Sequence, residues 1–65
     1  MEVTVNNRAF ILSKGSTVTD LLEHMNSPKS VAVFINGRQL LLAEYDKYVL
    51  EEKDNIRVIR PLGGG

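Results

Sequence analysis

One segment of this chain has the periodicity of an amphipathic helix, and it limits the folds open to the rest. Thr17 precedes the segment and Asp20 lies three residues later, which is the pattern of a capping box. Four apolar residues follow the spacing i, i+3, i+4 and i+7 and therefore share one helix face: Val18, Leu21, Leu22 and Met25. Because one helix can cover only one face of a sheet, the other segments are expected to form a single sheet packed against it.

Alternating or β-branched segments on both sides of this helix predict strands. Asn6-Asn7-Arg8 and Asn36-Gly37 are expected to be hairpin turns, because Asn and Gly tolerate positive φ. The helix should end near Asn26, since Pro28 disfavours helical geometry in the residue before it. The expected strands are residues 2–6, 9–12, 31–35, 38–42 and 56–60.

The segment between the fourth and fifth expected strands has a weaker pattern. Residues 43–48 are expected to form a short helical turn or a loop. Val49 and Leu50 are expected to pack back onto the core, and residues 51–55 to form a polar turn. The whole pattern predicts an α+β fold, with a mixed sheet of four to five strands packed on one main helix.

Length and composition limit how this fold can be stabilised. A chain of 65 residues forms one domain and buries only about 60% of its unfolded surface. It contains no cysteine, so it has no disulfide, no thiolate nucleophile and no cysteine-based zinc site. We therefore expect the apolar core alone to hold the domain together.

Charge and hydropathy exclude several classes of function. Eight basic and eight acidic side chains give a net charge of +0, which argues against electrostatic binding to nucleic acid or to a membrane. No apolar run reaches membrane-spanning length. Met1 leads directly into a charged, alternating segment rather than a secretory signal, so a cytoplasmic protein is expected.

The side chains offer no convincing active site. His24 is the single histidine and is expected at the surface. Lys14-Gly15-Ser16 lacks the spacing of a phosphate-binding P-loop. The acidic residues Glu51, Glu52 and Asp54 could bind a hard cation, but a solvated turn is the expected arrangement. The sequence therefore predicts no catalytic residue, no metal site and no resident cofactor.

The last five residues, Pro61-Leu62-Gly63-Gly64-Gly65, cannot contribute to a core. We expect residues 1–60 to form the domain and residues 61–65 a flexible tail that reaches about 17 Å when extended. Termini are often poorly ordered, so the tail could lack a role. Alternatively, glycines without a Cβ could let the terminal carboxylate enter a narrow slot in another protein.

The assembled pattern resembles the ThiS/MoaD family of sulfur carriers, which are ubiquitin-like β-grasp proteins, and most closely its ThiS branch in thiamine thiazole biosynthesis. The resemblance covers essentially the whole chain. It departs at Leu41-Leu42, where the family often has Pro-Arg, and at Asp54-Asn55, where it often has Gly-Asp. The matching segments are the opening hairpin, Thr17-Val18-x-Asp20-Leu21-Leu22, Val31-Ala32-Val33-x-Ile35-Asn36-Gly37, Glu44-Tyr45 and Ile56-x-Val58-Ile59-Arg60-Pro61-Leu62-Gly63-Gly64-Gly65.

The resemblance implies a mechanism centred on Gly65. Its carboxylate would be adenylated by a ThiF-type, E1-like adenylyltransferase that uses Mg-ATP, with Leu62, Gly63 and Gly64 recognised by the partner. Sulfur supplied through a cysteine desulfurase would convert the adenylate to a thiocarboxylate. That sulfur would then be delivered to a ThiG-type thiazole synthase. The carrier itself would have no catalytic group and bind no cofactor.

Two points stay open from the residues. Phe34, Ile59 and Arg60 are expected to form a partner-binding surface, which Ile11 could extend; alternatively, residues 40–48 cover Phe34. The chain could also serve molybdopterin synthesis, act as a ubiquitin-like modifier joined to lysines through Gly65, or be an interaction module with an idle tail.

Overall fold

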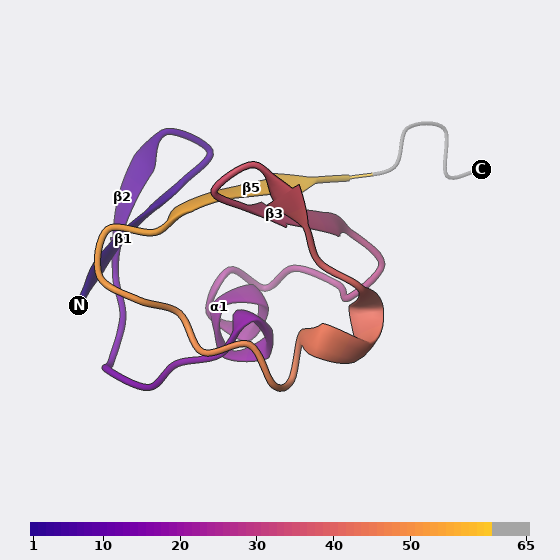
Figure 1. Cartoon of the computed structure of the whole chain (residues 1–65), viewed down its shortest axis with the longest axis horizontal. Helices are drawn as coiled ribbons and strands as arrows, with labels where there is room; N and C mark the ends of the chain where they lie inside the picture. The colour runs from indigo at the N-terminus through magenta and orange to yellow at the C-terminus, as the bar shows by residue number, and fades with distance from the viewer. Residues whose placement is uncertain (61–65) are drawn as a thin grey trace.

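The computed structural model describes residues 1–60, which form a five-stranded mixed sheet packed on one α-helix (Figure 1). The strand order is β2-β1-β5-β3-β4; β1 and β5 are parallel, and the other neighbouring pairs are antiparallel. The predicted α+β architecture is confirmed, and it is the β-grasp fold. The elements are β1 (Glu2–Val5), β2 (Arg8–Ile11), α1 (Val18–His24), β3 (Ala32–Ile35), β4 (Arg38–Gln39), the 3-10 helix η1 (Leu42–Glu44) and β5 (Asn55–Ile59).

Both predicted hairpin turns are present, and each contains two residues with positive φ. Asn6 and Asn7 have φ values of 50° and 69° between β1 and β2. Asn36 and Gly37 have φ values of 50° and 88° between β3 and β4. Two successive left-handed residues match the right-handed twist of the paired strands, so these turns set the register of both hairpins.

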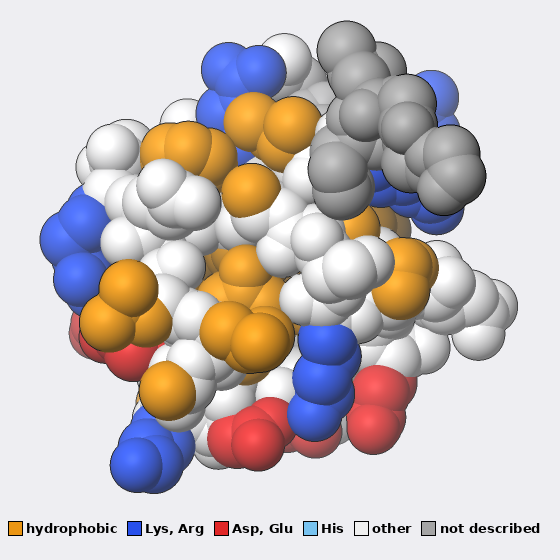
Figure 2. Space-filling model, turned by 90° about the vertical axis from the view of Figure 1, so that its right-hand side faces the viewer, with side chains coloured by type: hydrophobic (Ala, Val, Ile, Leu, Met, Phe, Trp, Pro, Cys, Tyr) orange, Lys and Arg blue, Asp and Glu red, His pale blue; other side chains and the backbone are white. Residues whose placement is uncertain are grey.

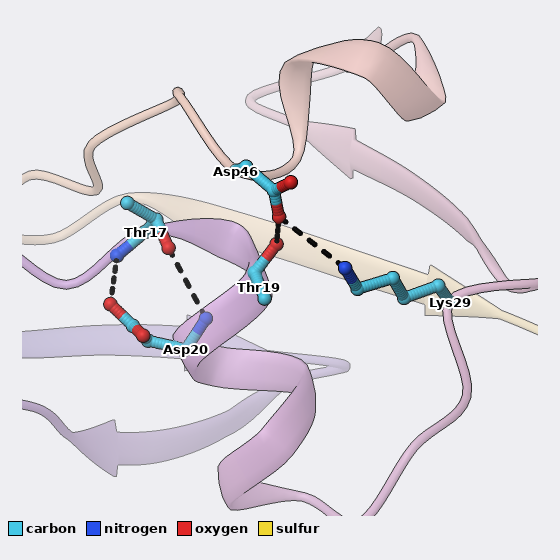
Figure 3. Close-up of polar contacts among 5 residues, drawn as sticks. All are labelled: Thr17, Thr19, Asp20, Lys29 and Asp46. Atoms are coloured by element: carbon cyan, nitrogen blue, oxygen red, sulfur yellow. Dashed lines mark hydrogen bonds and ion pairs between the residues drawn. The ribbon is translucent and has the colours of Figure 1, made fainter.

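The ends of α1 are fixed by hydrogen bonds that its own sequence supplies. The Thr17 hydroxyl accepts from the Asp20 amide at 3.2 Å, and the Thr17 amide donates to the Asp20 carboxylate at 2.9 Å (Figure 3). At the other end, Asn26 adopts a φ of 55°, and the Ser27 amide donates to the Leu22 carbonyl at 2.8 Å. This left-handed cap stops the helix where the sequence predicted, two residues before the proline.

The core lies between α1 and the inner face of the sheet. Val33 and Ile35 of β3 and Ile56 of β5 point toward the helix, while Phe34 is half-buried on the opposite, outer face. The most deeply buried large side chains are Leu21, Leu22, Ile56, Val3, Val5, Val18 and Val33.

The prediction that a strand extends over residues 38–42 is wrong, because β4 ends at Gln39. Leu40 still bonds to the sheet through its amide, which donates to the Val33 carbonyl at 2.9 Å. The Leu41 amide instead donates to the carboxylate of Glu44 at 2.9 Å, and η1 begins at the next residue. Glu44 therefore turns the chain away from the sheet edge. The short helical turn predicted nearby is confirmed.

Two predictions on the segment before β5 need correction. Leu50 is buried as expected, but the neighbouring Val49 is exposed, because consecutive side chains of this extended segment point to opposite sides. Asp54 is not part of a solvated turn. It is only 7% exposed, and its carboxylate accepts hydrogen bonds from the Glu51 amide and the Asn36 side chain.

No helix within residues 1–60 is long and apolar enough to cross a membrane. The same residues contain no group of three or more His, Asp or Glu side chains placed to hold a metal ion.

Candidate functional site

The candidate site is the end of β5, where the chain leaves the sheet toward its C-terminus (Figure 1). β5 is the central strand, with β1 on one side and β3 on the other. Ile56 and Val58 point into the core, whereas Arg57 and Ile59 lie on the outer face. The strand that leads into the tail is therefore held on both flanks and on one face.

Asn6 fixes the last part of β5 beyond the point where β1 ends. Its side-chain oxygen accepts from the Val58 amide at 2.9 Å, and its side-chain nitrogen donates to the Val58 carbonyl at 3.1 Å. The Asn6 backbone amide also donates to the Ile56 carbonyl at 2.9 Å. The Asn6 side chain thus makes the two hydrogen bonds with Val58 that a neighbouring strand would otherwise make.

Asn36 fixes the beginning of β5 in a similar way. Its amide donates to the Asn55 carbonyl at 2.7 Å, and its side-chain oxygen accepts from the Asn55 amide at 2.9 Å. Its side-chain nitrogen donates to the buried Asp54 carboxylate at 3.0 Å. The two hairpin turns therefore hold opposite ends of the strand that leads to the tail.

On the outer face, Phe34 and Ile59 line one shallow depression of about 320 Å³ together with Gly37 and Arg57. Phe34 lies opposite Arg57 in the β3–β5 register, and Ile59 is 44% exposed. Residues 40–48 do not line this depression. Phe34 and Ile59 therefore lie on one outer surface, as expected, and Phe34 is half-buried there, so it is neither fully exposed nor fully covered.

The charges near the end of β5 are positive. Arg57 and Arg60 are exposed and, with Ile59, line a second depression beside the Asn6-Asn7 turn. Among residues 1–60 the one ion pair within 4.0 Å joins Lys29 to Asp46, so neither arginine is paired with another described residue. The surface at the root of the tail is apolar with a cationic border.

Ile11 does not join this surface, so that part of the expectation is wrong. It lies on the edge strand β2 and pairs with Glu2 at the start of β1, whereas Ile59 extends past the end of β1. Ile11 lines a different depression with His24 on the helix side. The cause is register: Ile11 is two strands away and at the opposite end of the sheet.

The predicted tail residues Leu62, Gly63, Gly64 and Gly65 lie outside the described residues. The structure places their attachment point, Arg60, directly after β5.

Comparison with known proteins identifies the chain. The model of the ThiS family matches residues 1–65. The chain belongs to the ThiS family. No curated protein sequence matches it.

Two solved structures of ThiS proteins have the same fold. The crystal structure of the thiamine biosynthesis protein ThiS from Geobacter metallireducens is 26% identical, with a TM-score of 0.85 and full coverage of both chains. An NMR solution structure of a thiamine biosynthesis protein from the same organism is also 26% identical, with a TM-score of 0.81. It covers all of this chain and 88% of that one. This ThiS-family chain therefore shares its β-grasp fold with thiamine biosynthesis proteins.

The sequence reading missed the second role of the turn asparagines and the structural role of Asp54. The Asn6 side chain bonds to Val58, 52 positions later, and Asn36 bonds to Asp54, 18 positions later. Local spacing has no information on such distant partners. The positive φ of Asn6 and Asn36 was readable from the turn pattern, but the direction of their side chains was not.

Proposed function

We propose that this ThiS-family chain is a sulfur carrier for thiamine biosynthesis, and that the Gly65 carboxylate is the group that receives the sulfur. The observation that supports this most is the family match over residues 1–65, which includes the glycine-rich C-terminal segment. The hydrogen bonds between Asn6 and Val58 add support, because they fix the end of the strand that precedes this segment.

The first step activates a poor electrophile. An α-carboxylate has a pKa of about 3.3–3.7 and is ionised near neutral pH. In the proposed reaction, a Gly65 carboxylate oxygen attacks the α-phosphorus of Mg-ATP bound to a ThiF-type adenylyltransferase. Pyrophosphate leaves, and the product is an acyl-adenylate with AMP as a good leaving group.

The second step introduces sulfur. The terminal sulfur of a persulfide, formed through a cysteine desulfurase, attacks the Gly65 carbonyl carbon and displaces AMP. A thiol then cleaves the sulfur–sulfur bond of the acyl disulfide by exchange, which leaves a thiocarboxylate on the carrier. Its sulfur is the nucleophile delivered to a ThiG-type thiazole synthase.

The carrier's part in this chemistry is presentation rather than catalysis. Orientation of the carboxylate and stabilisation of the developing charge belong to the partner enzyme. The carrier offers a docking surface made of Phe34, Ile59 and Arg60, with Arg57 at its border. We propose that acidic and apolar groups of the partner contact this surface while the tail enters the active site.

The proposal predicts a strict requirement for small residues at the end of the tail. Gly64→Ala and Gly65→Ala each add a Cβ near the carbonyl carbon that must be approached. Each variant should lower carrier-dependent ATP–pyrophosphate exchange by about 10- to 100-fold, the scale of a misplaced reacting group. The far-ultraviolet circular dichroism spectrum and the thermal midpoint should match those of the unmodified chain. Equal exchange rates for all three proteins would contradict the proposal.

A further inference from the structure

A second apolar surface lies outside the Phe34–Ile59 face. Leu41 and Leu42 are 70% and 63% exposed, the former as exposed as any large apolar side chain in residues 1–60. They border an open groove of about 460 Å³, called the leucine groove here. Its lining residues are Lys29, Ser30, Val31, Ala32, Gln39, Leu40, Leu41, Leu42 and Tyr45.

Hydrogen bonds hold the two walls of the leucine groove in place. The buried Tyr45 hydroxyl donates to the Val31 carbonyl at 2.8 Å, which joins the segment after η1 to the segment before β3. The Glu44 carboxylate accepts from the Leu41 amide at 2.9 Å and fixes the bend that exposes both leucines. The exposed leucines are therefore displayed by a defined backbone and do not belong to a loose loop.

The leucine groove lies beside the point where the chain leaves the sheet. Ala32, which lines the groove, pairs with Ile59 in the antiparallel β3–β5 register. The preceding residue, Val31, also lines the groove and therefore lies on the same side as Arg60, which follows Ile59. Figure 2 views the side of the molecule on which η1 lies in Figure 1; hydrophobic side chains are spread over this face among basic side chains, and acidic side chains lie along its lower part. A protein that binds the chain just after β5 must therefore lie next to the leucine groove.

Size and charge indicate what kind of partner fits. A stable interface takes about 20–30 residues from each partner, whereas nine residues, the two exposed leucines included, line this groove. The one charged lining residue, Lys29, is paired with Asp46 at 3.4 Å, so the groove itself is close to neutral. The nearby positive charge without a partner among residues 1–60 is that of Arg57 and Arg60 at the end of β5. A transient partner with an apolar protrusion, and with acidic residues that face these arginines, matches this surface better than a second copy of the chain.

We propose that the leucine groove is a second docking surface for the adenylating enzyme, filled by an apolar protrusion with acidic residues beside it. This inference rests on the proposed function, because it assigns a further contact to the enzyme that activates Gly65. Contact with the groove would extend the interface from the Phe34–Ile59 face to the edge of the sheet at β4. The added binding energy would not depend on the reaction at the Gly65 carboxylate.

The test compares Leu41→Ser/Leu42→Ser with Ile11→Ser in ATP–pyrophosphate exchange by the ThiF-type enzyme of the same organism. Ile11 is a matched control, because it is also 70% exposed but lies away from the groove. The double variant should raise the KM for the carrier by about 10- to 100-fold with kcat unchanged, since it removes ground-state and transition-state binding equally. Ile11→Ser should leave both constants unchanged, and both variants should keep the circular dichroism spectrum of the unmodified chain.

Other occupants of the groove give different results. An unchanged KM for the double variant would overturn the inference but leave the proposed function intact. A lower KM would overturn it in favour of the chain's own residues 61–65 as occupant. Concentration-dependent sedimentation as a dimer, abolished by the double variant with KM unchanged, would overturn it in favour of a second copy. No exchange with the unmodified chain would overturn the proposed function and this inference together.

Discussion

Asn6 and Asn36 each combine a backbone role with a side-chain role. Both have a φ of 50°, which an asparagine tolerates better than most residues, and both close a two-residue hairpin turn. Both also direct their side-chain amide to β5, at Val58 and at Asn55. Glycine would adopt the positive φ of the turn, but it has no side chain to bond to β5. The identity of these residues therefore matters for how firmly the root of the tail is held.

This dual role predicts different effects for two substitutions in one turn. Asn6→Gly keeps the left-handed geometry but removes both hydrogen bonds to Val58, so it should lower the free energy of unfolding by about 1–3 kcal/mol. Asn7→Gly is the matched control, because Asn7 has a φ of 69° and its side chain bonds to no other described residue. It should change the stability by less than about 0.5 kcal/mol. Urea unfolding measures both, and equal losses would contradict the role assigned to Asn6.

Turn chemistry was readable at the residue scale, whereas distant side-chain partners were not. Asn36-Gly37 indicated a hairpin with no knowledge of the fold, since positive φ is a local requirement. The burial of Asp54 depends on Asn36, which approaches only after β3 and β5 have paired. An acidic residue among other acidic residues was reasonably expected in solvent. Its role as a buried hydrogen-bond acceptor becomes visible only in the assembled structure.

At the scale of elements, the segment around η1 is fastened to the start of α1. The Val18 and Thr19 amides are at the start of the helix and have no partner within it. They donate instead to the carbonyls of Tyr48 and Tyr45. Thr19 also donates its hydroxyl to the Asp46 carboxylate, which forms an ion pair with Lys29 at 3.4 Å (Figure 3). These contacts hold the segment that follows β4 against the helix rather than against the sheet.

The Asp46 contacts predict a pH dependence of stability. The hydrogen bond from Thr19, then the charge of Lys29, lower the pKa of Asp46 below its usual value of 3.8. A lowered folded-state pKa stabilises the fold fully above the unfolded value, and this contribution disappears as the pH falls through the folded value. Asp46→Asn should therefore be less stable than the unmodified chain at pH 7, and the difference should shrink below pH 3.8.

Thermal unfolding from pH 7 down to pH 2.5 measures this difference. Thr19→Ser, which keeps the hydroxyl, should retain the pH dependence of the unmodified chain, whereas Thr19→Val should lose part of it. A stability difference between Asp46→Asn and the unmodified chain that stays constant or grows at low pH would contradict the role given to Asp46.

Elements with a strong local signal were predicted correctly, and the miss occurred where two signals competed. The capping box at Thr17 and the apolar face of α1 defined the helix, and the alternating strands defined the sheet. Residues 40–42 are all leucine, which favours extending a strand, but Glu44 caps the Leu41 amide and starts η1 instead. Three identical leucines contain no sequence signal that shows where the strand ends.

At the scale of the whole molecule, stability depends on very few buried side chains. A domain of this length is expected to have a free energy of unfolding of roughly 3–10 kcal/mol. Ile56 is fully buried at the centre of the sheet, in the strand that leads to the tail. Truncation there removes packing against both the helix and the neighbouring strands. One substitution in the core can therefore remove much of the free energy of unfolding.

Two isoleucines of β5 give a direct comparison. Ile56→Ala should cost about 2–5 kcal/mol and leave the chain partly unfolded at 37 °C. Ile59→Ala, in the same strand but 44% exposed, should cost about 1 kcal/mol or less. Ile59→Ala should instead weaken binding to the proposed adenylating enzyme, because Ile59 belongs to the proposed docking surface. Circular dichroism melting curves distinguish the two, and similar midpoints would contradict the burial argument.

The central claim is that a rigid β-grasp domain presents a chemically active Gly65 carboxylate. Intact-mass spectrometry tests it most directly, after incubation of the full chain with a ThiF-type enzyme, Mg-ATP and a persulfide source. The account predicts a mass shift that corresponds to replacement of one oxygen by one sulfur, dependent on ATP and absent when Gly65 is deleted. An unchanged mass under these conditions, or covalent attachment of the chain to lysines of other proteins, would contradict it.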